Sequence, residues 1–384
     1  MSLHSRAYLP AVQGLARRTP ALVILGPRQS GKTSLAKLAF PKHAWFDLED
    51  PRHHARLRAD PLFALSEHRQ VVLDEVQRMP ELFPVLRAWL DADHRRRAIL
   101  LGSASPHLVS SASESLTGRV LFFDLPPLSV FEADPATLWR VGGFPRLHWS
   151  RPRARPDEWY PAYLRTTLEQ DVPQLGFALP PLRARTLLTM VAHAQGSTLN
   201  LSELSGPLGV SYHTVSAALD ILEGVFLIRR LQPWAVNVRK RLVKAPKLYV
   251  RDSGLLHSLL GMGWTRTAQL AHPKVGASWE TFCLEQLITH AKLVDPGADA
   301  YFYRTQAGLE LDLVLVLHGK RVGVEVKLGV TPRPTTSMEL AMKDLGIAKG
   351  YQVNSSDTLE KLKPGVFVGG LVPVMEALGL TPGK

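Results

Sequence analysis

The sequence predicts an α/β protein with a parallel sheet in its N-terminal part, a winged helix in the middle and a second α/β unit at the C-terminus. In the N-terminal third, short apolar runs are followed by glycine-rich or polar residues, which is typical of buried parallel strands. A segment rich in proline and arginine at 151–156 cannot continue a helix or a central strand. Two strand-like runs with acids lie near 310–327. The expected parts are 1–150, 151–250 and 251–384.

The most informative motif is G-P-R-Q-S-G-K-T at 26–33, between the apolar run 21–25 and a helical pattern at 34–39. This is the P-loop pattern GxxxxGK[ST] in its expected strand–loop–helix context. Two glycines let the loop curl so that backbone N–H groups face phosphates. The alternative, a glycine-rich turn with a solvent-exposed lysine, leaves the motifs below unexplained. The predicted ATP-binding residues are Gly26, Pro27, Arg28, Gln29, Ser30, Gly31, Lys32, Thr33 and Ser34.

Within this loop, two side chains have distinct expected roles. Lys32 would reach the β- and γ-phosphates of ATP, and the Thr33 hydroxyl would take one position on Mg²⁺. The partner motif is V-V-L-D-E-V at 71–76, an apolar strand that ends in two acids, where open α/β sheets place their ligands. Asp74 would hold Mg²⁺ through water, and Glu75 would polarise the attacking water.

A third apolar strand at 98–102 ends in Ser103-Ala-Ser105. A polar side chain in this position can sense the γ-phosphate or orient the water, and we expect Ser103 rather than Ser105 to do so. The alternative is an ordinary serine that caps a helix.

Three further motifs follow, and with them a resemblance becomes specific. They are S-L-T-G-R at 115–119, P-P-L-S at 126–129 and G-G-F-P at 142–145. Together with the P-loop and L-D-E-V, this order resembles a prokaryotic family of AAA-type ATPases that carry a C-terminal restriction-endonuclease-like domain of unknown function. The resemblance implies ATP hydrolysis with ATP and Mg²⁺ as cofactors.

The same resemblance gives Arg119 a candidate role. In AAA ATPases an arginine just before the fifth core strand commonly acts in trans as an arginine finger, and Arg119 matches that place. We therefore expect a homo-oligomer, with a hexameric ring as one candidate size. The alternative is a surface arginine paired with Asp124 or with a backbone carbonyl. The helix at 159–171 also resembles the family, but Gln170 stands where an arginine is expected, so no sensor-2 residue is assigned.

Composition places limits on the cellular setting. The chain has 384 residues, a formal net charge of +12 and one cysteine, Cys283, so it cannot form an internal disulfide. Its first residues lack the apolar region of a signal peptide, and no run approaches the ~20 apolar residues of a membrane span. We expect a cytoplasmic protein that does not enter a membrane.

Residues 183–232 predict a helix-turn-helix with a wing. Its third helix runs from Tyr212 to about Glu223, and the wing strand covers 225–231. Eight basic residues and no acid follow between 224 and 251, which indicates contact with DNA phosphates. The alternative is a winged helix that only mediates packing. The expected nucleic-acid contacts are Arg229, Arg230, Arg239, Lys240, Arg241, Lys244 and Lys247.

The C-terminal third contains the D-x(n)-E-x-K pattern of PD-(D/E)xK nucleases. Asp312 lies in one expected strand, and Glu325 and Lys327 lie two apart on the next. The two carboxylates would bind Mg²⁺ or Mn²⁺, Lys327 would position or activate water, and Glu280 matches the helix acid that often completes such a site. Arg304 could approach the acids from a preceding strand. E-x-K alone is weak, and such domains also persist as inactive binding modules.

These observations lead to competing hypotheses of function. The first is an ATPase that acts on DNA, with hydrolysis driving remodelling, translocation or gated cleavage. The alternative is a regulatory NTPase switch that signals to a protein partner and keeps an inactive nuclease fold as a binding module. In a third hypothesis, the nuclease is the enzyme and the ATPase is its gate.

Overall fold

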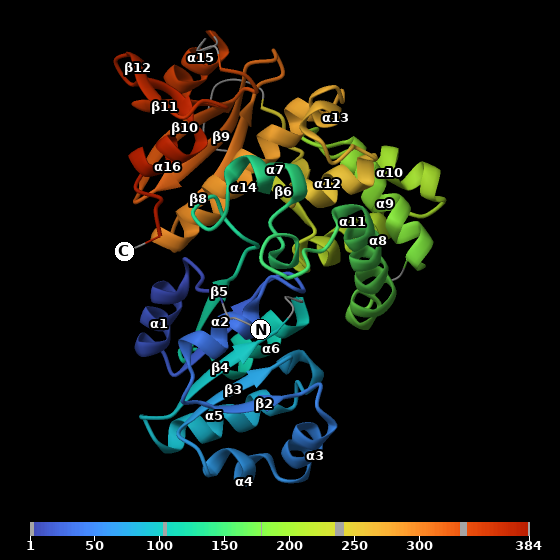
Figure 1. Cartoon of the computed structure of the whole chain (residues 1–384), viewed down its shortest axis with the longest axis vertical. Helices are drawn as coiled ribbons and strands as arrows, with labels where there is room; N and C mark the ends of the chain where they lie inside the picture. The colour runs from blue at the N-terminus through green and yellow to red at the C-terminus, as the bar shows by residue number, and fades with distance from the viewer. Residues whose placement is uncertain (1–3, 103–105, 178, 235–241, 331–335, 383–384) are drawn as a thin grey trace.

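The protein is described by a computed structural model that covers residues 4–102, 106–177, 179–234, 242–330 and 336–382 (Figure 1). The N-terminal sheet lies at one end of the long axis, the second sheet at the other, and a helical region between them. This mixed α/β architecture, with a parallel N-terminal sheet and a C-terminal sheet domain, confirms the predicted fold class. Among the described residues, no helix is long and apolar enough to cross a membrane.

The N-terminal sheet has five parallel strands in the order β2-β3-β4-β1-β5. Its strands are β1 (Ala21–Leu25), β2 (Ala44–Asp47), β3 (Gln70–Asp74), β4 (Arg97–Leu101) and β5 (Val120–Asp124). Every residue of β1 is buried, as expected for a central strand of a parallel sheet. Since all strands run the same way, the segments that follow β1 and β3 emerge at the same edge.

Helices cover both faces of this sheet, because alternate residues of each strand point to opposite sides. Val12, Leu35 and Ala36 pack with Leu22 and Ile24 on one face. The α3, α4, α5 and α6 helices contribute to the core on the other face. The helices are α1 (Leu9–Arg18), α2 (Lys32–Ala39), α3 (Pro51–Ala59), α4 (Pro61–Ser66), α5 (Leu82–Ala92) and α6 (Pro106–Ser115).

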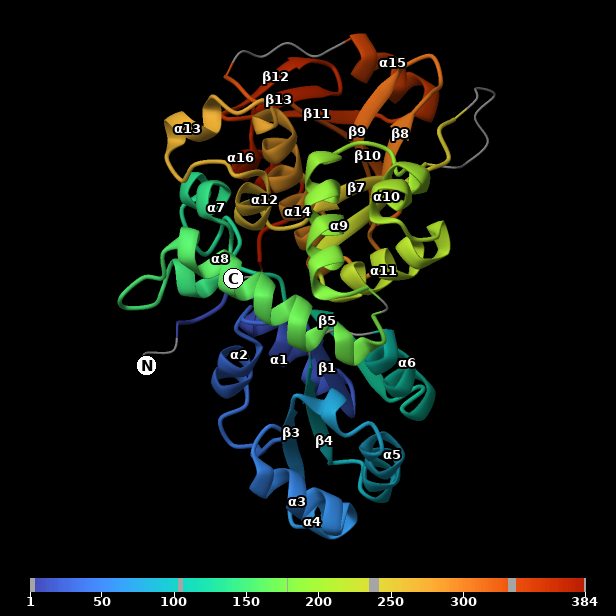
Figure 2. The same cartoon turned by 90° about the vertical axis from the view of Figure 1, so that its right-hand side faces the viewer.

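The helical region has its own core, which runs from Phe144 to Leu256 in the sequence. In Figure 2, α8 descends from this region towards the N-terminal sheet. Three helices lie in the segment predicted as a helix-turn-helix, and the third begins at Tyr212 as expected, capped by Ser211. The helices of this region are α7 (Pro135–Val141), α8 (Pro156–Thr166), α9 (Pro181–His193), α10 (Leu201–Leu208), α11 (Tyr212–Gly224), α12 (Ser253–Leu260) and α13 (Arg266–Leu270).

The second sheet has eight strands in the order β12-β13-β11-β10-β9-β8-β6-β7. The long helix α14 and α16 pack on one face, and α15 packs on the other. The strands are β6 (Ile228–Pro233), β7 (Lys247–Val250), β8 (Asp299–Arg304), β9 (Glu310–Leu317), β10 (Lys320–Val326), β11 (Lys349–Asn354), β12 (Leu359–Lys363) and β13 (Val366–Gly370). The helices are α14 (Val275–Val294), α15 (Thr336–Leu345) and α16 (Leu371–Ala377).

The predicted wing does not stand apart from the C-terminal domain. The strands β6 and β7 pair antiparallel, and β6 also pairs parallel with β8 at Gln232 and Pro233. The ribbon therefore extends the second sheet across the boundary expected near residue 250.

A buried ion-pair cluster fixes this ribbon to α14. Arg229 from β6 donates from Nε and Nη2 to Glu285, the latter bond 2.9 Å long, and Arg251 Nε donates to Glu285 Oε2 over 2.9 Å. Burial alone would raise the pKa of Glu285, but the two guanidinium groups lower it to about 2. This carboxylate therefore stays charged in the folded protein.

We predict that Glu285→Gln lowers the free energy of unfolding at pH 7 by about 3–5 kcal/mol, because it leaves two buried guanidinium groups without a counter-charge. The folded pKa lies below the ordinary value of 4.5. The wild-type stabilisation should thus be complete above pH 4.5 and decrease as the pH falls towards 2. Urea unfolding across this range measures both effects.

Glu158→Gln provides the control, since Glu158 pairs with Arg155 only at an exposed surface. Equal losses of stability in the two variants would contradict a structural role of the buried cluster.

Candidate functional site

The P-loop connects β1 to α2, and its backbone takes the shape that the motif requires. Gly31 has a φ of +94°, a left-handed conformation that favours glycine. Gly26 lies so close to Leu125 that a Cβ would be 2.4 Å from its carbonyl oxygen. Gln29, with a φ of +63°, also has a left-handed backbone. The N-terminus of α2 follows directly at Lys32, so its free N–H groups face the loop.

The Lys32 ammonium group lies inside the curled loop. Nζ donates to the carbonyl oxygens of Gly26 at 2.9 Å and Pro27 at 3.1 Å, and the residue is only 6% exposed. Burial lowers the pKa of Lys32, while the nearby carboxylates of Glu75 and Asp74 act in the opposite direction. The loop thus holds one buried cation at the centre of the site.

The two expected Mg²⁺-binding side chains are in contact. Thr33 Oγ1 donates to Asp74 Oδ2 at 2.9 Å, which brings the start of α2 to the end of β3. Burial raises the pKa of Asp74 to about 6, and the hydrogen bond from Thr33 partly offsets this. A hydroxyl and a carboxylate are the oxygen donors that Mg²⁺ prefers. These residues therefore fit the ion that the P-loop family implies.

Glu75 adopts a strained backbone beside these residues. Its φ of +55° is left-handed, which costs on the order of 1–3 kcal/mol for a residue other than glycine. Its side chain accepts a hydrogen bond from Gln77 Nε2, and its N–H donates to Asp74 Oδ1 at 3.1 Å. Strain of this kind is concentrated at functional sites, which supports a functional role of Glu75.

An ion pair that the sequence analysis missed lies across the same site. Arg28 Nη1 of the P-loop donates to Asp171 Oδ1, in the π-helical turn 167–171 that follows α8. Burial raises the pKa of Asp171, Arg28 lowers it, and Glu75 raises it, which places all three groups near one another. The preceding residue, Gln170, is exposed. Asp171, the acid next to Gln170, therefore provides the link to the P-loop.

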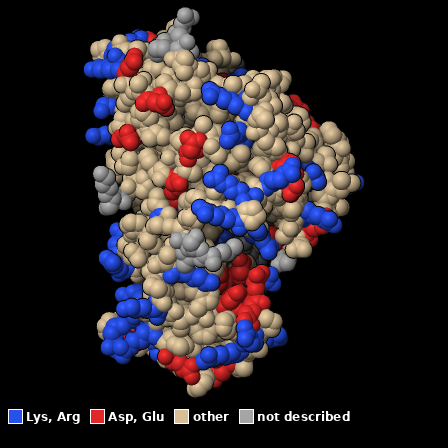
Figure 3. Space-filling model, viewed as in Figure 1, with Lys and Arg blue, Asp and Glu red and all other residues tan. Residues whose placement is uncertain are grey.

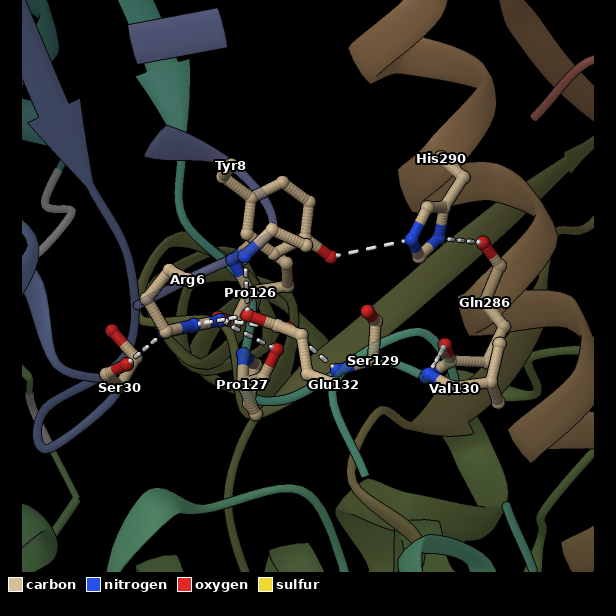
Figure 4. Close-up of polar contacts among 11 residues, drawn as sticks. Arg6, Tyr8, Ser30, Pro126, Pro127, Ser129, Val130, Glu132, Gln286 and His290 are labelled. Atoms are coloured by element: carbon tan, nitrogen blue, oxygen red, sulfur yellow. Dashed lines mark hydrogen bonds and ion pairs between the residues drawn. The ribbon is translucent and has the colours of Figure 1, made fainter. Parts of the chain in front are cut away.

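Arg6 connects the back of the P-loop to the P-P-L-S motif (Figure 4). Its side chain is buried and donates to the carbonyl oxygens of Ser30 at 2.7 Å, Pro126 at 3.0 Å and Pro127 at 3.2 Å. Nε also donates to Glu132 Oε1 at 2.6 Å. The P-P-L-S motif is therefore joined to the P-loop through Arg6.

The same group of contacts continues to the C-terminal domain. Glu132 Oε2 accepts from Ser129 N, and Val130 N donates to Oε1 of Gln286 on α14 at 3.0 Å. Tyr8 Oη lies 3.4 Å from His290 Nε2 on the same helix. Figure 4 shows these side chains in a row from Ser30 to α14. A chain of direct contacts thus joins the P-loop to the C-terminal domain.

The G-G-F-P motif makes a second junction. The Gly143 N–H donates to Asp252 Oδ2 at 2.8 Å, and Tyr160 Oη donates to Asp252 Oδ1 at 2.6 Å. Asp252 also caps α12, where it accepts from Leu255 N. This buried aspartate binds three separate segments together.

Two other predicted residues have different outcomes. Ser103 and its alternative Ser105 lie outside the described residues. Arg119 makes two hydrogen bonds to Asp91 at the end of α5, of 2.6 and 3.0 Å, and is partly exposed. The acid that it pairs with is Asp91 rather than Asp124, and Nη1 also donates to a backbone carbonyl, that of Thr117, at 3.0 Å, as the alternative expected. A role in trans remains a prediction.

The expected nucleic-acid contacts fall into three groups. Arg229 pairs with Glu285, Arg230 with Glu223 and Asp220, and Lys247 with Glu310, so internal acids already hold these three cations. Lys244 is exposed. The other three, Arg239, Lys240 and Arg241, lie outside the described residues.

The structure brings the C-terminal acids together. In the antiparallel pairing of β9 with β10, Val324 is opposite Leu313, and the next step of this register places Glu325 opposite Asp312 on the same face. Lys327 Nζ lies 3.1 Å from Glu325 Oε1. Burial and the charge of Glu280 raise the pKa of Asp312 above its ordinary value.

Two further residues at this place were not predicted as part of it. Lys247 and Tyr249 lie two positions apart on β7 and both reach Glu280, with Tyr249 Oη donating to Oε1 at 2.7 Å. Glu310 Oε1 is 2.6 Å from Lys247 Nζ. Arg304 Nε, named from the sequence as a neighbour of the acids, is 3.6 Å from Glu310 Oε2. No sequence pattern links β7 to these acids.

Comparisons with known proteins agree with the N-terminal geometry. Residues 18–133 match the AAA domain family, residues 132–266 match the domain of unknown function DUF8612, and residues 275–371 match the domain of unknown function DUF4143. Together with the P-loop and the acids after β3, the first match defines an AAA-type P-loop ATPase domain at the N-terminus. No nuclease family is among these three matches.

Two curated proteins are similar over most of the chain. They are the uncharacterized proteins Rv2008c of Mycobacterium tuberculosis and Mb2031c of Mycobacterium bovis, each 42% identical over 339 residues that span 86% of this chain and 76% of the relative. The chain belongs to the same family as these two proteins.

Solved structures with some similarity include a Walker-type ATPase of Pyrococcus abyssi, at 14% identity and a TM-score of 0.44, covering 67% of this chain and 96% of that one. The match to a signal transduction ATPase with numerous domains from Pyrococcus horikoshii covers 77% of this chain and 46% of that one, at 15% identity and a TM-score of 0.25.

Proposed function

We propose that the chain hydrolyses ATP in an Mg²⁺-dependent reaction at the P-loop. The observation that carries this proposal is the meeting of Lys32, Thr33 and Asp74 at one edge of the N-terminal sheet, with Thr33 bonded to Asp74. Mg²⁺ would neutralise phosphate charge when bound there. Lys32 would exchange the loop carbonyls for the β- and γ-phosphates, and Glu75 would orient the attacking water.

Two substitutions separate binding from hydrolysis. Lys32→Ala should abolish tight ATP binding because it removes the cation that faces the phosphates. Glu75→Gln should retain binding and lower turnover by about 100-fold or more, the usual contribution of a general base. Calorimetry with ATP and steady-state phosphate release measure the two quantities.

Lys37→Ala is the matched control, since Lys37 is an exposed lysine on the same helix and should leave both quantities unchanged. Hydrolysis by Glu75→Gln at the wild-type rate would refute the assignment of the catalytic acid.

For Arg119 we propose action in trans within a homo-oligomer. In an isolated chain the guanidinium group is held by Asp91 at a partly exposed site. Because exposed ion pairs contribute little, a neighbouring subunit's nucleotide could take the arginine from Asp91. A hexameric ring is one size compatible with this role.

DNA is the proposed partner of the ATPase. Support comes from the net charge of +12 and from the basic run that contains Arg239, Lys240, Arg241 and Lys244. Since Arg229, Arg230 and Lys247 pair internally, the proposal depends on the other four. In the view of Figure 3, basic side chains are spread over the whole length of the molecule, so this face alone does not indicate a path for DNA.

Replacing Arg239, Lys240 and Arg241 with alanine should flatten the salt dependence of DNA binding by about 0.9 in log–log slope for each lost phosphate contact. A triple substitution of Arg52, Arg56 and Arg58 on α3 matches the loss of charge and should have a smaller effect. Fluorescence anisotropy at several salt concentrations measures the slope.

Identical slopes in the two triple variants would assign the binding to net charge alone. ATP turnover that is slow and unaffected by DNA would instead favour the NTPase switch that signals to a protein partner.

For the C-terminal part we propose a nuclease-like fold. Support comes from the long helix with Glu280, the two antiparallel strands with Asp312 and Glu325, and Lys327 beside Glu325. Whether such a fold can bind the metal needed for cleavage depends on the cations around these acids.

A further inference from the structure

The acids of the C-terminal domain do not fit a divalent metal in their present arrangement. Among the described residues, no group of three or more histidine, cysteine, aspartate or glutamate side chains is placed to hold a metal ion. This holds although Glu280 and Asp312 are close enough for one charge to affect the other. The acids are therefore near one another without forming a metal site, and the groups between them explain why.

Lys247 lies where these acids face one another. The residue is 2% exposed, and its Nζ lies 2.6 Å from Glu310 Oε1 and 3.7 Å from Glu280 Oε1. Burial would lower the pKa of Lys247, but the carboxylates of Glu280, Asp312 and Glu310 raise it. The ammonium group is thus a fixed positive charge among three acids.

Other protein groups also contact carboxylate oxygens of the same acids. Tyr249 Oη donates to Glu280 Oε1 at 2.7 Å, and the Val326 N–H donates to Asp312 Oδ2 at 2.8 Å. Glu310 Oε2 lies 3.6 Å from Arg304 Nε. A magnesium ion needs about six oxygen ligands at 2.0–2.1 Å, so it would have to displace several of these partners.

The strand that carries Lys247 is itself held in place. Leu248, the next residue, donates to the Ser197 carbonyl at 3.0 Å and accepts from the Gly196 N–H at 2.8 Å. Nζ of Lys247 also lies 5.5 Å from the centroid of the Phe302 ring. Backbone bonds on β7 and the ring contact therefore keep the ammonium group in this position.

We propose that Lys247 takes the place of a divalent cation among Glu280, Glu310 and Asp312, so that the C-terminal domain is a binding module closed to metal by its own lysine. A metal ion and an ammonium group would compete for the same carboxylate oxygens, and their positive charges would repel each other. The basic residue that resembled a DNA contact in the sequence thus completes an internal ion-pair cluster.

Manganese binding without nucleotide tests this directly. Mn²⁺ is titrated into the full chain and followed by electron paramagnetic resonance, with Asp312→Asn in parallel to subtract binding elsewhere. Wild type and Asp312→Asn should bind alike. Lys247→Met should gain a Mn²⁺ site at these acids. Its affinity should exceed that of the same acids in wild type by about tenfold or more, because one adjacent positive charge is removed. Adding Asp312→Asn to Lys247→Met should abolish this gain.

The melting temperature provides a second measurement, with Lys247→Gln as a second variant in case Lys247→Met folds poorly. Mn²⁺ should raise the melting temperature of Lys247→Met, and of Lys247→Gln, by more than it raises that of wild type, whose shift reports binding elsewhere, such as at the P-loop. Lys320→Met, at an exposed lysine that begins β10 in the same domain, is the matched control and should behave as wild type. Two outcomes would overturn the proposal: wild-type Mn²⁺ binding that Asp312→Asn removes, or no gain in either Lys247 variant. Both are independent of ATP hydrolysis.

Discussion

The buried ammonium group of Lys32 is the charge around which the N-terminal part is arranged. A charged group without water needs partners, and the curled loop supplies two carbonyl oxygens within 3.1 Å. Asp74 and Glu75, at the end of β3, supply the opposite charge, because parallel strands bring the ends of β1 and β3 to one edge. A phosphate group that binds in the loop would add negative charge beside Lys32 and so change the charge balance between this lysine and the acids.

The position of the P-loop is coupled to the rest of the molecule. Arg6 holds the Ser30 carbonyl from behind and pairs with Glu132, whose segment reaches Gln286 on α14. On the opposite side, Arg28 pairs with Asp171 after α8. A change in the loop on nucleotide binding would therefore act on two segments outside the N-terminal sheet.

The C-terminal cluster has a similar physical basis but the opposite consequence. At the P-loop, an enclosed lysine lies next to the hydroxyl and the acids that we propose as metal ligands. At β7, an enclosed lysine and a tyrosine use the acids themselves. In our proposals, two buried lysines among carboxylates thus belong to one site suited to phosphate and Mg²⁺ and to another closed to divalent cations.

The N-terminal site could be predicted because its chemistry lies in short stretches of sequence. Eight residues of the P-loop and six around Asp74 carry their own strand and turn signals, and the parallel sheet brings them together. Arg6 could not be found in this way, since its partner Glu132 is 126 positions away and no pattern marks either residue. The internal use of Arg229 and Lys247 was missed for the same reason: their acids lie on α14 and β9, far along the chain.

The most direct measurement of the central claim is a crystal structure with a non-hydrolysable ATP analogue and Mg²⁺. The account predicts that Lys32 Nζ leaves the carbonyl oxygens of Gly26 and Pro27 for the phosphates, with the ion between Thr33 and Asp74. An analogue bound elsewhere, or Lys32 still on both carbonyls beside an occupied loop, would contradict it.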